Sequence, residues 1–404
     1  MSLDETPPHD SLPHDPRFDD APDRRGTHCV KWDAMEGLYG VPSSDGLAMW
    51  VADMEFRPPQ GVLDAVSAMR DHGVFGYFGD PSRYTAAIRW WMAERHGWQV
   101  EEDWIFTTNG LVNGAALCID AFTEPGDGVV LLTPVYHAFR RVIDAAGRRA
   151  AECPLPVRDG RYAIEREAIE AGLTGGERLL ILCSPHNPGG RVWSRAELQI
   201  VADIARERDM VLVSDEVHHD LVMPGQVHLP AAHLDGVEDR LVMMTAATKT
   251  FNIAGAHVGN VIIPDPTLRR RFAARMAAFG ISPNSFGMHM ATAAYSPEGA
   301  AWVDDCVRYI DANRRLFDAR VNAIPGLRSM PLEATYLAWV DFEGTGMEPD
   351  EFIGRVQRDA RIAPNHGTTF GAGGEHFLRF NIAAPRAMIE EACSRLERAF
   401  GDLQ

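Results

Sequence analysis

Three polar residues with complementary chemistry each follow a short apolar run of the sequence. Asn187, Asp215 and Lys249 offer an amide, a carboxylate and an amine. The amine can form a Schiff base with an aldehyde, the carboxylate can pair with a cationic nitrogen, and the amide can donate a hydrogen bond to an anionic oxygen. This set suits chemistry on an aldehyde cofactor. The preceding apolar runs are Leu179–Cys183, Met210–Val213 and Leu241–Met244.

Lysine is rare in this chain, which makes each lysine informative. Of the 39 lysines and arginines, only two are lysines, Lys31 and Lys249. Arginine provides surface charge equally well, but its guanidinium stays protonated and cannot become the free amine that attacks a carbonyl. An arbitrary lysine is usually a solvated surface residue, so the hypothesis for Lys249 depends on its neighbours. Lys31, beside Trp32 and Asp33, is expected to serve packing or ion pairing.

The surroundings of these residues complete a cofactor-binding pattern. Thr107–Val112 passes from a strand through Gly110 into a helix N-terminus, which can bind phosphate, although most such turns bind nothing. Two prolines stiffen the loop that carries Asn187, whose plain alternative is ordinary turn chemistry. Asp215 ends a buried strand, so it implies a cationic partner. An amine, an acid, an amide and a phosphate site at the strand ends match the needs of pyridoxal phosphate.

The elements that must position these groups alternate between helix and strand. Short apolar runs separated by helical patterns are typical of strands buried on both faces of a mainly parallel sheet. Ser194–Glu197 is a capping box that predicts a helix over Leu198–Ala205. Beyond residue 297 the pattern changes to a long amphipathic helix and alternating strands. The other predicted elements are helices 84–96, 111–122, 297–323 and 386–400, and strands 104–107, 129–132, 258–263, 336–342 and 377–382.

Composition excludes several classes of protein. The formal net charge of −18 argues against nucleic acid or an anionic membrane as a partner. No apolar run approaches the ~20 residues that span a bilayer, and the N-terminus lacks a secretory pattern, so a cytoplasmic location is expected. Six cysteines without a C-x-x-C pair predict reduced, mostly buried thiols rather than a zinc site or disulfides.

Several longer motifs add a family resemblance that covers the chain from about residue 25 to its end. With them, the chain resembles the fold-type I pyridoxal-phosphate enzymes of the class I/II aminotransferase family, and most closely the MalY/PatB cystathionine β-lyase branch. The resemblance implies an aspartate aminotransferase-like fold, a pyridoxal 5′-phosphate cofactor and a homodimer. The motifs are Gly26–Asp33, Met49–Phe56, Gly73–Tyr77, Thr133–His137, Ser184–Pro188 and Phe377–Asn381.

The resemblance also implies roles for individual residues. Lys249 would bind the cofactor aldehyde, Asp215 would pair with the pyridine nitrogen, and Asn187 would contact the phenolate oxygen and the substrate. Arg379 would clamp the substrate α-carboxylate, a task that suits its bidentate fork. The remaining implied contacts are Tyr136 stacked on the ring, Gly110, Leu111 and Thr248 at the phosphate, Tyr77 reaching the phosphate of the other subunit, and Ala52 beside the substrate. For Tyr136 and Tyr77 the alternative is an aromatic of the core or of an interface.

Two residues depart from common patterns of the wider family. His257 stands where many relatives have a phosphate-binding arginine, which puts the phosphate contacts in question. His218 stands where aminotransferases commonly have a tyrosine, and this favours elimination over transamination. His218, His219 and Asp220 invite a metal interpretation, but three adjacent residues cannot all face one ion on a strand or helix. No metal is expected.

The expected organisation is α/β with two domains. A large domain, residues 48–296, would carry a mainly parallel, seven-stranded-type sheet flanked by helices and would bind the cofactor. A smaller α+β domain would combine residues 297–404 with the N-terminal segment 26–47. Residues 1–25, rich in proline and aspartate, are expected to form a disordered or loosely draped arm.

The expected activity is a C–S β-lyase that cleaves L-cystathionine or another L-cysteine S-conjugate to a thiol, pyruvate and ammonia. An aminotransferase on the same fold, which would return the proton to the cofactor carbon, is the alternative. A relative from specialised biosynthesis with an altered outcome, or a cofactor-binding regulatory protein with little turnover, remain further alternatives. The sequence does not define the leaving-group pocket.

Overall fold

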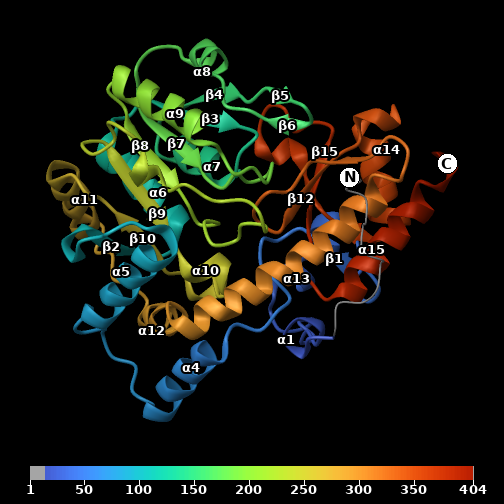
Figure 1. Cartoon of the computed structure of the whole chain (residues 1–404), viewed down its shortest axis with the longest axis horizontal. Helices are drawn as coiled ribbons and strands as arrows, with labels where there is room; N and C mark the ends of the chain where they lie inside the picture. Colours follow the sequence, from blue (N-terminus) through green and yellow to red (C-terminus); the bar gives the residue numbers. More distant parts are fainter. Residues whose placement is uncertain (1–13, 404) are drawn as a thin grey trace, which may run out of the picture.

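A computed structural model of the chain describes residues 14–403, and its core is a seven-stranded sheet (Figure 1). β10 runs antiparallel to both of its neighbours, while the β9-β8-β7-β3-β4 portion is parallel throughout. The prediction of a mainly parallel sheet is confirmed. In sheet order the strands are β2 (Ile105–Thr108), β10 (Gly259–Ile262), β9 (Leu241–Thr245), β8 (Val211–Asp215), β7 (Glu177–Cys183), β3 (Gly128–Thr133) and β4 (Arg149–Pro154).

Helices cover both faces of this sheet, which explains why its strands are apolar on both sides. Val130 and Leu132 of β3 pack on one face, and Val129 and Leu131 pack on the other. This alternation follows from the two-residue period of a strand. The first face is covered by α8 (Arg166–Gly172) and α9 (Arg195–Glu207), the second by α6 (Leu111–Phe122), α7 (Ala138–Ala145) and α11 (Pro266–Ala278).

The C-terminal part builds a second, antiparallel sheet of four strands. The long helix α13 (Pro297–Val321) packs against α15 (Arg386–Ala399) beside it (Figure 1). The N-terminal segment reaches the same region, because β1 (Leu47–Ala48) pairs in parallel with β13 (Ile362–Ala363). In sheet order the four strands are β11 (Arg328–Ser329), β12 (Leu337–Asp341), β15 (Phe377–Asn381) and β14 (Asn365–His366).

The predicted elements exist, and their ends differ from the prediction by only a few residues. The capping box at Ser194 is present, with its hydroxyl and the Glu197 carboxylate bonding each other's backbone amide. All six cysteines are free, and only Cys29 is not buried. Further helices are α2 (Val30–Asp33), α3 (Met35–Tyr39), α4 (Gln60–His72), α5 (Ser82–His96), α10 (Ala247–Thr250), α12 (Ser285–Ala294) and α14 (Pro349–Gly354).

The prediction of a disordered or loosely draped arm over residues 1–25 is wrong from residue 14 onward. Asp15 caps a short helix, α1 (Pro16–Asp19), whose Phe18 is buried against Phe56 and Trp302. One aromatic ring and its ion pairs supply enough contact to order a segment that is otherwise polar. Residues 1–13 lie outside the described part of the chain.

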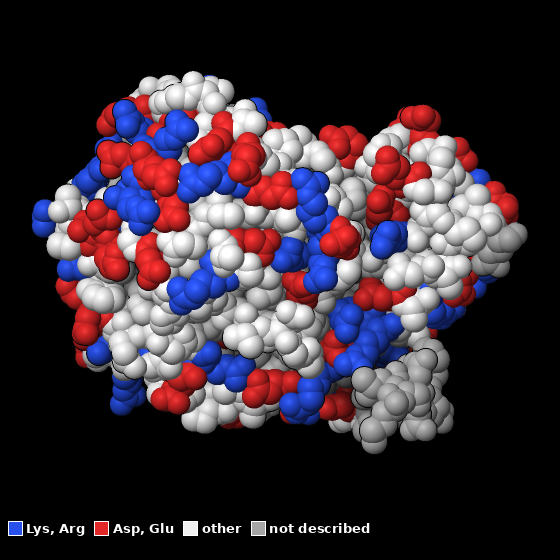
Figure 2. Space-filling model, turned by 45° about the horizontal axis from the view of Figure 1, so that its top comes forward, with Lys and Arg blue, Asp and Glu red and all other residues white. Residues whose placement is uncertain are grey.

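No helix among residues 14–403 combines the length and apolar character needed to cross a membrane. Acidic and basic side chains are interspersed on the face shown in Figure 2. Such mixing allows opposite charges to pair locally on the surface rather than to form a single charged field.

Candidate functional site

The strand ends open into one cavity of about 660 Å³ between the large sheet and the C-terminal part. β7, β8 and β9 are parallel neighbours, so their carboxyl ends share one edge of the sheet. Lys249 lies on α10, directly after β9. Of the residues predicted for the site, all except Tyr77 line this cavity. The fold therefore brings the sequence-predicted groups together.

The Lys249 amine is held by a backbone carbonyl at the wall of the cavity. Its Nζ donates to the Ala52 carbonyl oxygen at 2.7 Å. Burial lowers the pKa of Lys249 from 10.5 to about 8, and the Arg379 charge acts in the same direction. A larger fraction of free amine is therefore present near neutral pH than in an exposed lysine.

The Asp215 carboxylate is buried at the end of β8 with no described cationic side chain at ion-pair distance. Its Oδ1 accepts a hydrogen bond from the Val217 amide at 3.1 Å, and among residues 14–403 it makes no ion pair within 4.0 Å. Burial raises the pKa of Asp215 to about 7, with the Glu216 carboxylate adding to the rise. The cationic partner that the sequence implied is thus not supplied by the described protein, and the site has room for a cationic ring nitrogen.

Arg379 is a buried guanidinium whose described partners are neutral. It donates to Asn187 Oδ1 at 2.9 Å, to the Trp50 carbonyl at 2.8 Å and to Asn365 Oδ1. Its Nε has no hydrogen-bond partner among the described residues. Burial lowers the pKa of Arg379 to about 10. The group is therefore poised to receive an anion in the cavity.

The hydrogen bond from Arg379 also fixes the orientation of Asn187. Because the amide oxygen accepts from Arg379, the amide nitrogen is left as the donor available to the cavity. Three cis peptide bonds lie near this edge, at Pro134, Pro185 and Pro188, two of them in the Asn187 loop. The loop thus presents an amide donor at the cavity.

A cradle for an anionic group lies at the start of α6. Gly110 is the N-cap residue with φ 86°, a left-handed conformation that favours glycine, and Leu111 begins the helix. A Cβ at Gly110 would lie 4.0 Å from His257 Nδ1, so His257 borders the cradle. Thr248, at the start of α10, lines the same cavity. Free amides at a helix N-terminus favour a phosphate here.

Tyr136 and His218 also line the cavity, whereas the predicted residue Tyr77 lies elsewhere. The Tyr136 ring lines the cavity, with burial raising its pKa. Burial lowers the pKa of His218 to about 3, so its ring is neutral, and it meets the Tyr336 ring edge-on at 6.0 Å. Tyr77 is 99% exposed and lies outside the cavity of its own chain.

Sequence reasoning missed side chains that reach the cavity from distant segments. Tyr39, Trp50, His137 and Asn365 line it, and Tyr336 donates to the Ala52 carbonyl at 3.0 Å. The motif Met49–Phe56 was the one available signal, because an irregular segment rich in aromatic and charged residues has no packing pattern of its own. The tertiary fold alone brings the other residues to the site.

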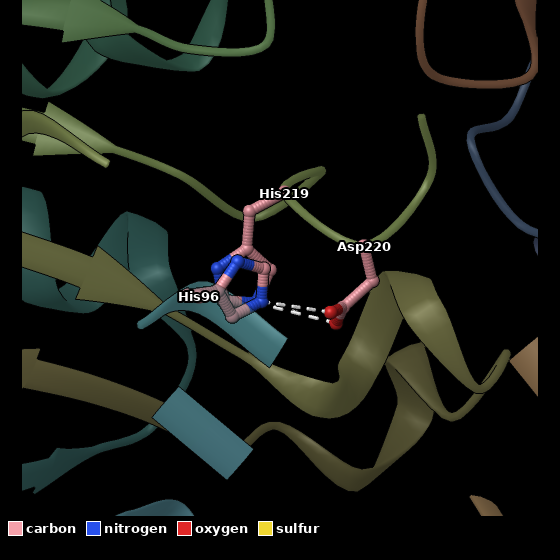
Figure 3. A group of neighbouring side chains, drawn as sticks. All are labelled: His96, His219 and Asp220. Carbon is pink, nitrogen blue, oxygen red and sulfur yellow. Dashed lines mark hydrogen bonds and ion pairs between the residues drawn. The ribbon is translucent and has the colours of Figure 1, made fainter. Parts of the chain in front are cut away.

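A second group of potential metal ligands, His96, His219 and Asp220, lies beside a separate cavity (Figure 3). His218 faces the main cavity while its neighbours face His96, as expected for adjacent residues. The rings of His96 and His219 stack at 4.0 Å and 14°, so their in-plane lone pairs run parallel instead of converging on one point. Asp220 already accepts from Trp91 and from the Thr250 hydroxyl at 2.8 Å. The group is arranged as a hydrogen-bonded support under α10.

Comparison with known proteins places this geometry in context. The family model described as aminotransferase class I and II matches residues 53–396. The chain is 38% identical to cystathionine beta-lyase PatB of Bacillus subtilis, over 95% of this chain and 99% of that protein. It is similar to cystalysin of Treponema denticola, whose structure contains pyridoxal 5′-phosphate, with a TM-score of 0.91, 35% identity, and coverage of 97% and 100%. A C-S lyase of Staphylococcus hominis, also bound to this cofactor, gives a TM-score of 0.86 with 28% identity and covers 95% and 98%.

Proposed function

The chain belongs to the aminotransferase class I and II family, and within it we propose that this protein is a pyridoxal-phosphate-dependent carbon–sulfur β-lyase. One observation carries the proposal. Lys249, Asp215 and Arg379 lie around one cavity, and each lacks the partner that an aldehyde cofactor bound to an amino acid supplies. The substrate class is an L-cysteine S-conjugate such as cystathionine.

The residues of the cavity fit pyridoxal phosphate group by group. Lys249 is the amine for its aldehyde, and Asp215 is the anion for its ring nitrogen. The Asn187 amide nitrogen is the donor for its phenolate oxygen, and Tyr136 lies where it can cover the ring. The phosphate is assigned to the cradle of Gly110, Leu111, Thr248 and His257. When bound, the cofactor supplies an electron sink for the pair of electrons left at the substrate Cα.

Two residues of the chain act directly on the substrate. Arg379, which lines the cavity, binds the substrate α-carboxylate, and this contact fixes the orientation of the Cα–H bond. Lys249, after the substrate amine has taken its place, removes the Cα proton as a general base, a role to which a pKa of about 8 is suited. The C–S bond then breaks with its electron pair on sulfur, the thiolate takes up a proton, and hydrolysis gives pyruvate and ammonia.

Elimination is preferred over transamination because of what surrounds Lys249. The neutral His218 ring occupies the place where aminotransferases commonly present a tyrosine hydroxyl, so the cavity lacks that donor beside the cofactor. The names of the relatives support the same choice. An aminotransferase is the alternative, and it requires a keto-acid acceptor that elimination does not need.

We further assign the active form to a homodimer in the cytoplasm. The exposed Tyr77 ring, with Val74 and Phe75 beside it, is available to a second copy of the chain. In this proposal Tyr77 reaches the phosphate of the partner's site. The six free cysteines suit a reducing compartment.

The proposal is tested by incubating the cofactor-loaded protein with L-cystathionine in the absence of any keto acid. Thiol and pyruvate should form in equal amounts and continue over many turnovers. A requirement for a keto acid, with conversion of the substrate to its own keto acid, would identify an aminotransferase. Bound cofactor without turnover on a panel of S-conjugates would favour a regulatory role.

A further inference from the structure

The segment 50–54 lacks regular secondary structure, yet side chains bind every one of its five carbonyl oxygens. Irregular backbone near a buried site must satisfy its polar groups in some way, and here long side chains do so. The conformation of this segment is therefore fixed by hydrogen bonds from side chains of distant parts of the chain. The donors are Arg379 to Trp50, Asn381 to Val51, Lys249 and Tyr336 to Ala52, Lys31 and Asn381 to Asp53, and Asn252 and Arg24 to Met54.

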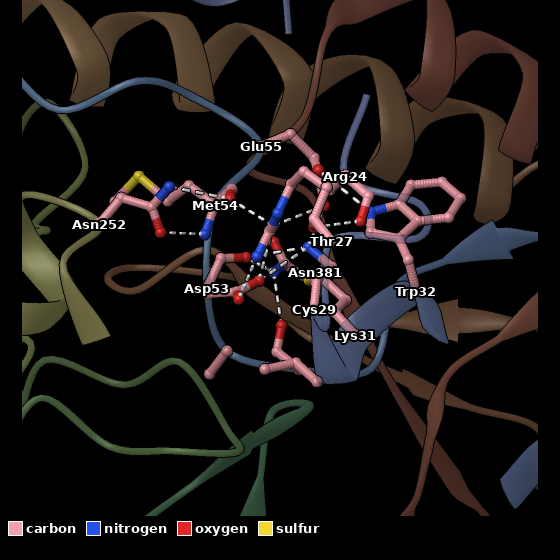
Figure 4. Close-up of polar contacts among 12 residues, drawn as sticks. Arg24, Thr27, Cys29, Lys31, Trp32, Asp53, Met54, Glu55, Asn252 and Asn381 are labelled. Carbon is pink, nitrogen blue, oxygen red and sulfur yellow. Dashed lines mark hydrogen bonds and ion pairs between the residues drawn. The ribbon is translucent and has the colours of Figure 1, made fainter. Parts of the chain in front are cut away.

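Four charged side chains cluster against the segment, as Figure 4 shows; Lys31 and Glu55 are buried, and Arg24 and Asp53 are partly buried. The Lys31 side chain is 1% exposed, and its Nζ lies 2.6 Å from Glu55 Oε1 and 2.9 Å from the Asp53 carbonyl oxygen that accepts its hydrogen bond. Arg24 lies 2.7 Å from the Asp53 carboxylate and 3.3 Å from Glu55. Two cations thus balance two anions, and each cation contacts Asp53, within the segment, and Glu55, the residue that follows it.

At the cavity, two carbonyls of the segment accept hydrogen bonds from Lys249 and Arg379. The Ala52 carbonyl holds Lys249 Nζ, and the Trp50 carbonyl holds Arg379 Nη2 at 2.8 Å. Ala52 lies next to Asp53, so a shift of the backbone at Asp53 moves the acceptor for Lys249. The ion pairs and the catalytic amine are therefore linked through one peptide unit.

We propose that the Lys31–Glu55 ion pair is a positioning device, which fixes the Ala52 carbonyl as the hydrogen-bond acceptor for the Lys249 amine whenever that amine is free of the cofactor. Lys31 is a positioning residue, because it touches neither the cofactor cavity nor the amine itself. The compact ammonium, with three donors, fits between a carboxylate and a carbonyl where a planar guanidinium fits less well. This accounts for the second lysine of a chain that otherwise uses arginine. The inference rests on the role proposed for Lys249.

The test uses the double variant Lys31→Met/Glu55→Gln, which removes the ion pair without leaving an unpaired buried charge. In the cofactor-free protein, trace acetylation over a pH series followed by peptide mass spectrometry gives the pKa of Lys249, without interference in a chain that has only two lysines. The pKa should fall by about one unit, because a held carbonyl acceptor favours the ammonium. In the loaded enzyme kcat should fall about 10- to 100-fold with cofactor content retained, since small displacements of a catalytic group cost this much.

Two further variants separate positioning from stability. Arg320→Met removes an ion pair with Glu397 that lies outside segment 50–54, and it should leave both the Lys249 pKa and kcat unchanged. Lys31→Arg keeps the charge and should lower the Lys249 pKa by a smaller amount than the double variant does. If the double variant does not fold, Lys31→Arg serves as the test in its place. A wild-type Lys249 pKa and kcat in either Lys31 variant would overturn the inference. The acetylation measurement needs no turnover, so its failure is distinguishable from a failure of the proposed lyase activity.

Discussion

At the scale of single residues, the site consists of charged groups that the fold leaves incompletely compensated. Asp215 is buried with one backbone donor, Arg379 is buried among neutral acceptors, and Lys249 is bound to a carbonyl. Burial shifts the pKa of each of the three groups toward its neutral form, and such groups reduce the stability of the protein without its ligands. The site is therefore expected to cost folding stability until cofactor and substrate bind.

Asp215→Asn tests this cost. Because the folded-state pKa of Asp215, about 7, lies above its ordinary 3.8, the native cofactor-free protein binds more protons than the unfolded chain between these values. Its free energy of unfolding should therefore fall as pH rises from about 4 to about 7. The variant should lose this dependence and gain about 4 kcal/mol above pH 7, at about 1.4 kcal/mol per unit. Denaturant unfolding at both ends of the window measures the difference.

The same variant should lose most of its lyase turnover, since the ring nitrogen would lack its anion. Greater stability of the cofactor-free protein together with lost activity is the expected pair of results. Equal stability of variant and wild type at pH 8, or near-normal kcat, would remove Asp215 from the assignment.

Arg379→Lys tests the carboxylate clamp. A lysine keeps a positive charge but loses the planar fork that binds Asn187, Asn365 and Trp50 together. The KM for cystathionine should rise by about 100-fold, which corresponds to a lost bidentate contact. Cofactor content, read from its visible absorption, should change little. An unchanged KM would mean that the α-carboxylate binds elsewhere.

At the scale of secondary-structure elements, the sequence predicts what periodicity encodes and misses what tertiary contacts decide. The runs Leu179–Cys183 and Leu241–Met244 predict buried strands. Because the strands are parallel, the residues that follow them lie at the same edge of the sheet. Segment 50–54 and Asn365 have no comparable local signal, because donors from distant parts of the chain hold them in place. The prediction of a disordered or loosely draped arm is wrong from residue 14 onward, because burial of one ring, Phe18, orders a segment of polar composition.

Phe18→Ala tests whether residues 14–25 are part of the folded structure. The ring contacts Phe56, Trp302 and Tyr309, and Asp19 accepts a hydrogen bond from the Tyr309 hydroxyl. Its removal should lower the free energy of unfolding by about 3 kcal/mol, as for other buried aromatic side chains. Arg25→Ala, which removes an exposed pair with Asp23, is the matched control and should leave stability unchanged. Equal stability of both variants would show that the segment is not docked in solution.

At the scale of the whole molecule, the proposed dimer makes each site dependent on two chains. Lys249→Ala and Tyr77→Ala should each be poorly active when alone. If Tyr77 serves the partner's site, a mixed dimer contains one site with both native residues. Unfolding and refolding the two variants together should then restore about a quarter of the wild-type activity, since half of the dimers would be mixed. Tyr77→Ala that is fully active by itself would contradict this arrangement.

The central claim is that Lys249 carries the cofactor, and the two-lysine composition makes it directly measurable. Borohydride reduction of the cofactor-loaded protein, followed by digestion and mass spectrometry, should place the reduced pyridoxyl adduct on the peptide that contains Lys249 alone. Lys31 should remain unmodified, because its side chain is buried in an ion pair with Glu55. An adduct on Lys31, or full lyase activity in Lys249→Ala, would contradict the mechanism.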